Sequence, residues 1–249
     1  MADLPILFSG SMVRAILREI EQPGTGKTQT RRVLNPQPAT FTPHVIDIGQ
    51  PYFDDDEGRW GQIETEWSSP GWDAPMGEPM REIFVPLPIR IKVGDRLYVR
   101  ETWAPLDALT HSDPGTQALA DRGFYRADDS TVEGEISRWR PGIHMPRWAS
   151  RITLIVTDVR VQRLQEISQE DAIAEGPGFV GKITGEVCES VAAHRLGIGP
   201  RWRTPRDWYA DLWDSLNAYR GHGWEANPWV AAYTFRPILG NIDEVPACP

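Results

Sequence analysis

The segment Lys27-Thr28-Gln29-Thr30-Arg31-Arg32 carries the densest set of chemically able side chains in this 249-residue chain. It places an ammonium, two hydroxyls and two guanidiniums within six residues, directly after the bend Pro23-Gly24-Thr25-Gly26. Glycines at such a bend let the backbone turn tightly. A lysine next to a threonine hydroxyl can serve as base for a nucleophile, as in serine–lysine variants of the catalytic triad. The alternative is a solvated basic loop.

Two backbone conformations lead to different arrangements of these side chains. If the segment is a strand, Lys27, Gln29 and Arg31 share one face, and the intervening residues share the other. If it is a turn, Lys27 and Thr30 converge. Both conformations are compatible with the sequence.

The same stretch excludes a nucleoside-triphosphate site. Gly24 to Thr28 is similar to the end of a phosphate-binding P-loop, but that motif needs a glycine at position 21, where the chain has Glu21. The motif also follows a buried strand. Here the preceding segment, 11–20, has the periodicity of a helix.

Glu101 is a second candidate, because its position in a strand places it on an apolar face. Residues 96–103 alternate so that Leu97, Val99, Glu101 and Trp103 lie on one side. A carboxylate there is costly unless it is paired or used chemically. It is therefore either a functional residue or one half of a buried structural salt bridge.

Tryptophans near these polar segments are candidates for stacking on a base. Trp103 and Trp148 each lie beside a polar stretch, where an aromatic plane can receive a nucleobase. The competing role for each of them is packing in the core.

The remaining pattern predicts short strands interspersed with a few helices. We expect one helix capped at Ser11 and a second from Ser168 to Glu175, stopped by Gly176. A third helix should start at Thr204 and bury one apolar face, which consists of Trp208, Leu212, Trp213 and Leu216. Strands are expected at 4–9, 89–91, 96–103, 123–127, 151–161 and 229–235, the fifth bent near Asp158. This order favours an α+β fold, a small mixed barrel with flanking helices, over a doubly wound sheet.

Length and composition indicate a single domain over residues 1–249. Residues 35–83 are rich in proline, glycine and acids, and we expect an irregular insertion there with one hairpin. Residues 204–238 form a C-terminal helix–strand extension.

The net charge is −9, and ten of the 35 acids lie between Asn35 and Glu82 with only two bases. The rest of the chain is close to neutral, which favours a nucleoside-sized ligand over a long nucleic acid.

Other function classes lack their signatures. No apolar run approaches the length of a membrane span, and no signal peptide is present at Met1, so a cytoplasmic protein is expected. Cys188 and Cys248 do not form a CxxC pattern, and the five histidines lack metal-ligand spacing. We therefore expect neither a metal nor a cofactor. By elimination, Lys27, Thr30 and Glu101 are the best catalytic set.

These motifs together resemble ASCH-domain proteins, in particular the long form found in phage and bacterial genomes. The resemblance rests on the first strand and helix, the Gly26–Arg32 motif, the segment from Val93-Gly94-Asp95 to Trp103, and the strand–helix pair 152–175. It implies a PUA-like fold, a small β-barrel with flanking helices beside a cleft.

Some ASCH proteins are amidohydrolases that remove the acetyl group from N4-acetylcytidine. They use a lysine, a threonine three residues on, and a glutamate from a following strand, and these positions match Lys27, Thr30 and Glu101. The resemblance thus implies that Thr30 attacks the amide carbonyl, Lys27 takes its proton, and Glu101 binds the cytosine edge and protonates the leaving amine. Backbone N–H groups near Gly26 are candidates for the oxyanion hole. The insertion at 35–83 and the C-terminal extension depart from the short amidohydrolases.

The substrate-binding residues expected alongside this set are Arg31, Arg100, Trp103 and Trp148. The expected partner is a small nucleoside, with weak RNA binding as a second class and no membrane. The rival function is a PUA-like module that binds RNA or a modified base, with Arg31, Arg32 and Arg100 on phosphates. A ribonuclease is a weaker third option, since no histidine pair or metal cluster is evident.

Overall fold

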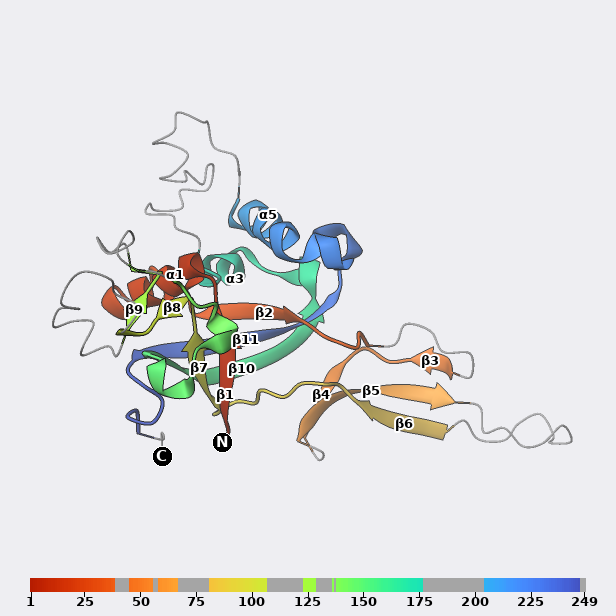
Figure 1. Ribbon diagram of the computed structural model, residues 1–249. Helices are drawn as coiled ribbons and strands as arrows, with labels where there is room; N and C mark the ends of the chain where they lie inside the picture. Colours follow the sequence, from red (N-terminus) through yellow and green to blue (C-terminus); the bar gives the residue numbers. More distant parts are fainter. Residues whose placement is uncertain are drawn as a thin grey trace, which may run out of the picture.

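The computed structural model describes residues 1–38, 45–55, 58–66, 81–106, 123–128, 136, 138–176 and 204–246. A five-stranded mixed sheet, in the order β1-β7-β10-β11-β2, forms its centre (Figure 1). The strands are β1 (Asp3–Leu7), β2 (Gln29–Val33), β7 (Arg96–Arg100), β10 (Ile152–Arg163) and β11 (Trp229–Leu239). The expected α+β class is confirmed at this level.

The pairing of the sheet joins segments that are far apart in the sequence. β1 runs parallel to β7, whereas β7, β10, β11 and β2 pair in antiparallel fashion. β10 and β11 pair over most of their length, with a register shift between Val156 and Asp158, where the sequence predicted a bend. Among the described strands β1 and β2 are the two edges, so no closed barrel is formed. Arg32 Nη2 nevertheless donates a hydrogen bond to Leu7 O at 2.7 Å and so ties one edge to the other.

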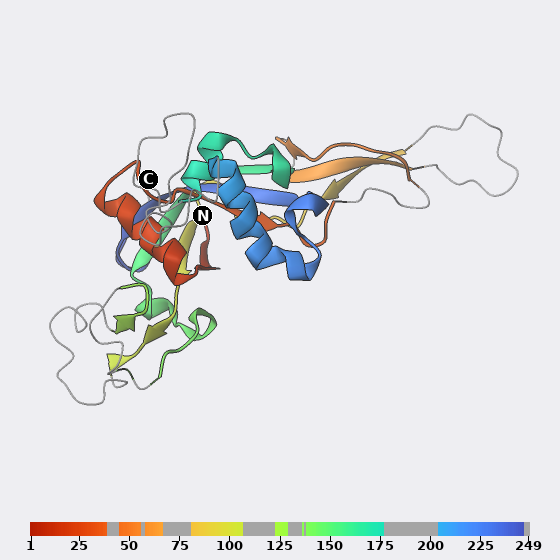
Figure 2. The ribbon, with the colours of Figure 1, turned by 90° about the horizontal axis from the view of Figure 1, so that it is seen from above.

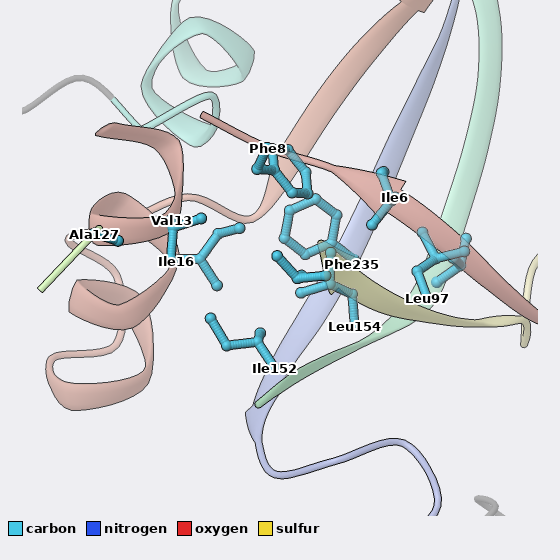
Figure 3. Packing of buried hydrophobic residues seen from close by; sticks show 11 residues of the cluster. Ile6, Phe8, Val13, Ile16, Leu97, Ala127, Ile152, Leu154 and Phe235 are labelled. Atoms are coloured by element: carbon cyan, nitrogen blue, oxygen red, sulfur yellow. The ribbon is translucent and has the colours of Figure 1, made fainter. Parts of the chain in front are cut away.

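The helix α1 (Gly10–Glu21) covers the sheet with an apolar stripe. Its Val13 and Ile16 are fully buried and pack with Phe8 and Phe235 in the main core cluster (Figure 3). Removal of apolar surface from water contributes about 25 cal/mol per Å², so the burial of this stripe is the main contribution that stabilises the packing of α1 on the sheet. The N-cap position is Ser9, not Ser11 as expected, and the Ser9 side chain makes no capping hydrogen bond.

Two further helices lie near β2. The helix α3 (Gln169–Ala174) starts at Ser168, whose side-chain oxygen accepts the Asp171 N–H, as predicted. The helix α5 (Pro205–Asn217) starts with the predicted Thr204 capping box. Its most buried aromatic residues are Tyr209 and Trp213, whereas Leu216 is half exposed, contrary to expectation. A helical period carries Tyr209, one residue after Trp208, closer to the centre of the buried face.

The described residues between 45 and 86 are more regular than the sequence suggested. Instead of one hairpin, they form an antiparallel sheet of β3 (Val45–Ile48), β4 (Tyr52–Asp54), β5 (Arg59–Glu66) and β6 (Arg81–Pro86). This arm extends away from the central sheet (Figure 2). Edge-to-face contacts between Tyr52 and Phe84, and between Phe53 and Trp60, stabilise it.

Smaller elements complete the described chain. A two-stranded ribbon consists of β8 (Trp103–Ala104) and β9 (Phe124–Tyr125). Single 3₁₀ turns occur at Gly142–His144, Arg147–Ala149, Leu164–Glu166, Ala218–Arg220 and Trp224–Ala226. Over the described ranges, none of the helices is both long enough and apolar enough to cross a membrane. Cys188 and Cys248 lie outside these ranges.

Candidate active site

The Lys27 segment runs into strand β2, and its alternate side chains contact α3. Lys27 Nζ, Gln29 Nε2 and both terminal nitrogens of Arg31 donate hydrogen bonds to carboxylates of Asp171 or Glu175. The strand interpretation of the sequence is therefore confirmed. The turn, which would bring Lys27 and Thr30 together, is not formed.

Lys27 is almost completely buried, with 1% of its surface exposed. Its Nζ lies 2.6 Å from Glu175 Oε2 and 2.9 Å from the Glu175 carbonyl oxygen, and it donates to both. Burial lowers the pKa of the Lys27 ammonium below its ordinary value, the Glu175 carboxylate opposes this change, and the nearby guanidiniums of Arg32 and Arg31 add to it. The environment thus favours a neutral amine more than water does.

Two glycines permit this close approach of Lys27 to its neighbours. A Cβ on Gly176, which has φ +84°, would lie 2.7 Å from Lys27 Cβ and 2.9 Å from Ala15 Cβ. A Cβ on Gly26 would lie 2.3 Å from the backbone of α1, at Ala15 O. Glycine is therefore required on both sides of Lys27, where α1 and the end of α3 converge on it.

The backbone donors of the glycine bend are already used by the protein. The Glu19 carboxylate accepts the N–H groups of Gly24 and Gly26 at 2.8–3.0 Å. The Lys27 N–H donates to Ala15 O, and the next N–H donates to Ala174 O. The expected oxyanion role of the N–H groups near Gly26 is therefore wrong, because α1 supplies a carboxylate that occupies them.

Thr30 lies on the other side of β2 and pairs with Tyr233 of β11. It is 4% exposed, no hydrogen bond of its hydroxyl is found among the described residues, and this oxygen is not one of the fully enclosed polar atoms that lack a partner. The Thr30 hydroxyl thus remains available as a nucleophile or as a substrate ligand.

Glu101 is buried, as its alternation predicted, and has its own counter-ion. Its carboxylate accepts a hydrogen bond from Arg151 Nε at 3.0 Å, and Arg151 also bonds to Asp128. Arg151 stacks on Tyr125, with its Cζ 3.9 Å from the ring centroid. Glu101 is therefore half of a buried salt bridge, which was the alternative left open by the sequence. This pairing does not exclude a functional role.

Phe8 is the common neighbour of the two regions. Its ring centroid lies 5.8 Å from Lys27 Nζ and 5.2 Å from Arg32 Cζ. Its backbone N–H donates to Arg100 O, which directly precedes Glu101. The Lys27 region and the Glu101 region thus meet at Phe8, although within the described residues no hydrogen bond joins Lys27, Thr30 and Glu101 to one another.

The expected substrate-binding residues differ in how accessible they are. Arg31 is buried in its network, and Arg100 donates to the carbonyl oxygens of Met145 and Ile143. Trp103 is 2% exposed, whereas Trp148 is 49% exposed. The two rings pack edge to face, with their centroids 5.7 Å apart. Of this set, Trp148 alone presents a large open ring.

The residues that sequence reasoning missed are Glu175 and Asp171. They stand four residues apart on α3, where like charges repel. Glu175 also lies at the C-terminal end of the helix, where the helix dipole disfavours an acid. Two unfavourable placements on one short helix are a signal that cationic partners face it, and Lys27 and Arg31 are those partners.

The structure also contains an apolar cavity of about 410 Å³ at the junction of the arm and β10. It is lined mainly by hydrophobic side chains such as Trp60, Ile91 and Val159, and among the described residues its charged lining residues are Arg59 and Lys92. None of the predicted catalytic residues lines it. In the part of the chain that is described, no group of histidines, cysteines or acids could hold a metal ion.

Comparison with known proteins finds no family model, no curated protein and no solved structure that matches this chain.

Proposed function

We propose that this protein is an amidohydrolase that removes the acyl group from N4-acylated cytosine nucleosides. The observation that carries the proposal is a buried lysine with a lowered pKa, three residues before a threonine whose hydroxyl makes no hydrogen bond among the described residues. Desolvation of a lysine is a general way to obtain a neutral amine that acts as a base near neutral pH. The resemblance to ASCH-domain amidohydrolases and their PUA-like fold supplies the substrate class.

In the proposed reaction Thr30 Oγ attacks the acyl carbonyl carbon, and its proton passes to the neutral Lys27 amine. The C–N4 bond then breaks, and the Lys27 ammonium returns that proton to the departing N4. Lys27 then takes a proton from water, whose oxygen attacks the ester carbonyl carbon; the bond to Thr30 Oγ breaks, the Lys27 ammonium returns the proton to Thr30 Oγ, and the carboxylic acid leaves. The catalyst thus ends each cycle unchanged.

The role of Glu101 in this proposal follows from its partner. A carboxylate paired with a guanidinium is an acceptor, so we assign Glu101 to hold the cytosine edge and assign proton delivery to Lys27. Trp148, with its open ring, is proposed to stack on the pyrimidine. Substrate binding must bring Lys27 and Thr30 within hydrogen-bonding reach, because Lys27, two residues before β2, donates to Glu175 and makes no hydrogen bond to Thr30.

The test is turnover of N4-acetylcytidine by the purified protein, followed by loss of the acylated chromophore. Thr30→Val should reduce kcat/KM by about 10³-fold or more, as expected for a member of a catalytic unit. Thr28→Val, two residues earlier on the same strand side, is the matched control and should retain most activity. The absence of turnover with acetyl, propionyl and longer acyl groups would overturn the proposal.

The rival function, a module that binds RNA or a modified base, is less well supported. All three of its arginines donate to protein acceptors: Arg31 to Asp171, Arg100 to Met145 O, and Arg32 to Leu7 O, and Arg32 is the one whose residue surface is exposed. Such a module would show salt-dependent RNA binding without formation of a product. Arg32→Ala would lower the affinity for RNA and would reduce the slope of log K against log salt concentration by about one.

A further inference from the structure

Lysine is rare in this protein, and that makes Lys27 informative. The chain has 23 arginines but only three lysines, Lys27, Lys92 and Lys182. The two cations beside Lys27 are arginines, which stay protonated in proteins. Within this buried cluster, Lys27 is therefore the one cation that can lose its proton.

The partner of that amine is fixed by the end of a helix. Glu175 is the C-cap of α3, and it offers Lys27 both its carboxylate and its carbonyl oxygen. The Glu175 carboxylate is 4% exposed and receives a second hydrogen bond from Arg31 Nη1 at 3.0 Å. Glu175 is thus held on one oxygen by a permanent cation, and its other oxygen faces Lys27.

The charged and titratable groups around this pair come from four elements. They are Arg31 and Arg32 from β2, Asp171 from α3, Tyr209 from α5 and Arg160 from β10, which bonds to Asp171. Burial and the Glu175 carboxylate raise the pKa of Tyr209 well above its ordinary value, so the phenol stays neutral. Burial, with smaller contributions from Arg32 and Arg31, favours the neutral Lys27 amine, and Glu175 is the group that acts against it.

We propose that Glu175 is the positioning residue of the active site, which orients the Lys27 amine and controls how readily it releases its proton. This inference rests on the proposed function for its catalytic meaning, but its central claim concerns an acid–base equilibrium that can be measured without substrate. In the resting pair Lys27 donates to Glu175, and during turnover its amine moves to Thr30.

The first test is the titration of the lysine side chains by ¹H–¹⁵N NMR on protein labelled at lysine nitrogen. The three lysines give three signals, and Lys92, which is exposed, is an internal reference. Glu175→Gln removes the charge but keeps an acceptor, so the midpoint of the Lys27 signal should shift to lower pH. Asp171→Asn, on the same helix, contacts Arg31 and not Lys27, and should shift the midpoint much less.

Either of two results would overturn the inference: an unmoved Lys27 midpoint in Glu175→Gln, or an equal shift in Asp171→Asn. Circular dichroism establishes whether each variant is folded. If Glu175→Gln does not fold, Glu175→Asp serves in its place. It withdraws the carboxylate by one methylene and should shift the midpoint in the same direction by less.

The second test is the pH profile of kcat/KM. The acidic limb, where Lys27 must lose its proton, should move to lower pH in Glu175→Gln, and the maximal kcat should fall about 10²-fold because the amine is less well placed. A merely structural glutamate would lower thermal stability without moving the limb. Failure of wild-type turnover would overturn the amidohydrolase proposal alone, whereas turnover with an unmoved limb would overturn the role of Glu175 alone.

Discussion

Two buried ion pairs each contain a glutamate, and they differ in the cation. In one pair, Lys27 and Glu175 have side chains that are 2% and 4% exposed. In the other, Arg151 and Glu101 are 13% and 1% exposed. Both carboxylates are bonded at 3.0 Å or less, so geometry alone does not distinguish the pairs.

The difference lies in what each cation can do. Burial opposes the charged form of Arg151, but the carboxylates of Glu101 and Asp128 outweigh it and raise the pKa of the guanidinium further above its ordinary value. Burial lowers the pKa of Lys27 despite Glu175. The Arg151 pair is therefore permanently ionic and anchors a carboxylate, whereas the Lys27 pair can exchange a proton. The Lys27–Glu175 salt bridge is therefore the one suited to acid–base chemistry.

The largest predicted difference comes from removing each cation. Arg151→Met leaves Glu101 buried without its guanidinium and should reduce the free energy of unfolding by about 3–5 kcal/mol. Lys27→Met leaves Glu175 bonded to Arg31, so the loss should be only about 1–2 kcal/mol. Urea denaturation measures both. Equal losses would remove the distinction between the pairs.

A smaller difference is expected from the glycines that border each pair. Gly176→Ala forces a methyl group to within 2.7 Å of Lys27 Cβ at φ +84°, and should cost about 2–3 kcal/mol and disturb the Lys27–Glu175 contact. Gly142→Ala would place its methyl group 3.2 Å from the carbonyl oxygens of Arg100 and Glu101, which a slight shift relieves. Its cost should stay under about 1 kcal/mol. Thermal melts and urea midpoints of the two variants provide the comparison, and a Gly142→Ala loss as large as that of Gly176→Ala would contradict it.

The smallest effect is a pH dependence that only the lysine pair should show. The folded-state pKa of Lys27 lies below the unfolded one, so between these values the unfolded chain binds more protons and stability rises with pH. The unfolding free energy of the wild type relative to Lys27→Met should therefore increase toward pH 10, by at most about 1.4 kcal/mol per pH unit. The same difference for Arg151→Met should be flat, because arginine does not titrate there. A flat or falling curve for Lys27 would show that burial does not disfavour its charge.

Local patterns predicted much of the scaffold of this site. The alternation of 96–103 placed Glu101 in the core, and the strand alternative for the Lys27 segment grouped Lys27, Gln29 and Arg31 correctly. The end of α3 at Glu175 followed from its glycine. These features depend on backbone period and on cap residues, which neighbouring sequence determines.

The pairing of charges could not be predicted, because it depends on how distant elements pack. Lys27 and Glu175 are separated by 148 positions, and Arg151 reaches Glu101 from the start of a different strand. The sequence predicted one hairpin where the arm has four strands, because the prolines and glycines of this region hide the alternation that marks a strand. The closed barrel implied by the resemblance is not formed by the described strands, whose edges are joined by the Arg32 side chain.

The carboxylate of Glu19 gives the glycine bend an unexpected chemical character. Successive backbone N–H groups in a turn can form an anion-binding concavity, and here the anion that occupies it is a side chain of the same protein. A tethered group competes at an effective concentration in the millimolar range or above, which free phosphate in a dilute solution does not match. The bend is thus saturated with its own ligand before any substrate arrives, and its donors serve to fix Lys27 in place instead of to recognise a phosphate.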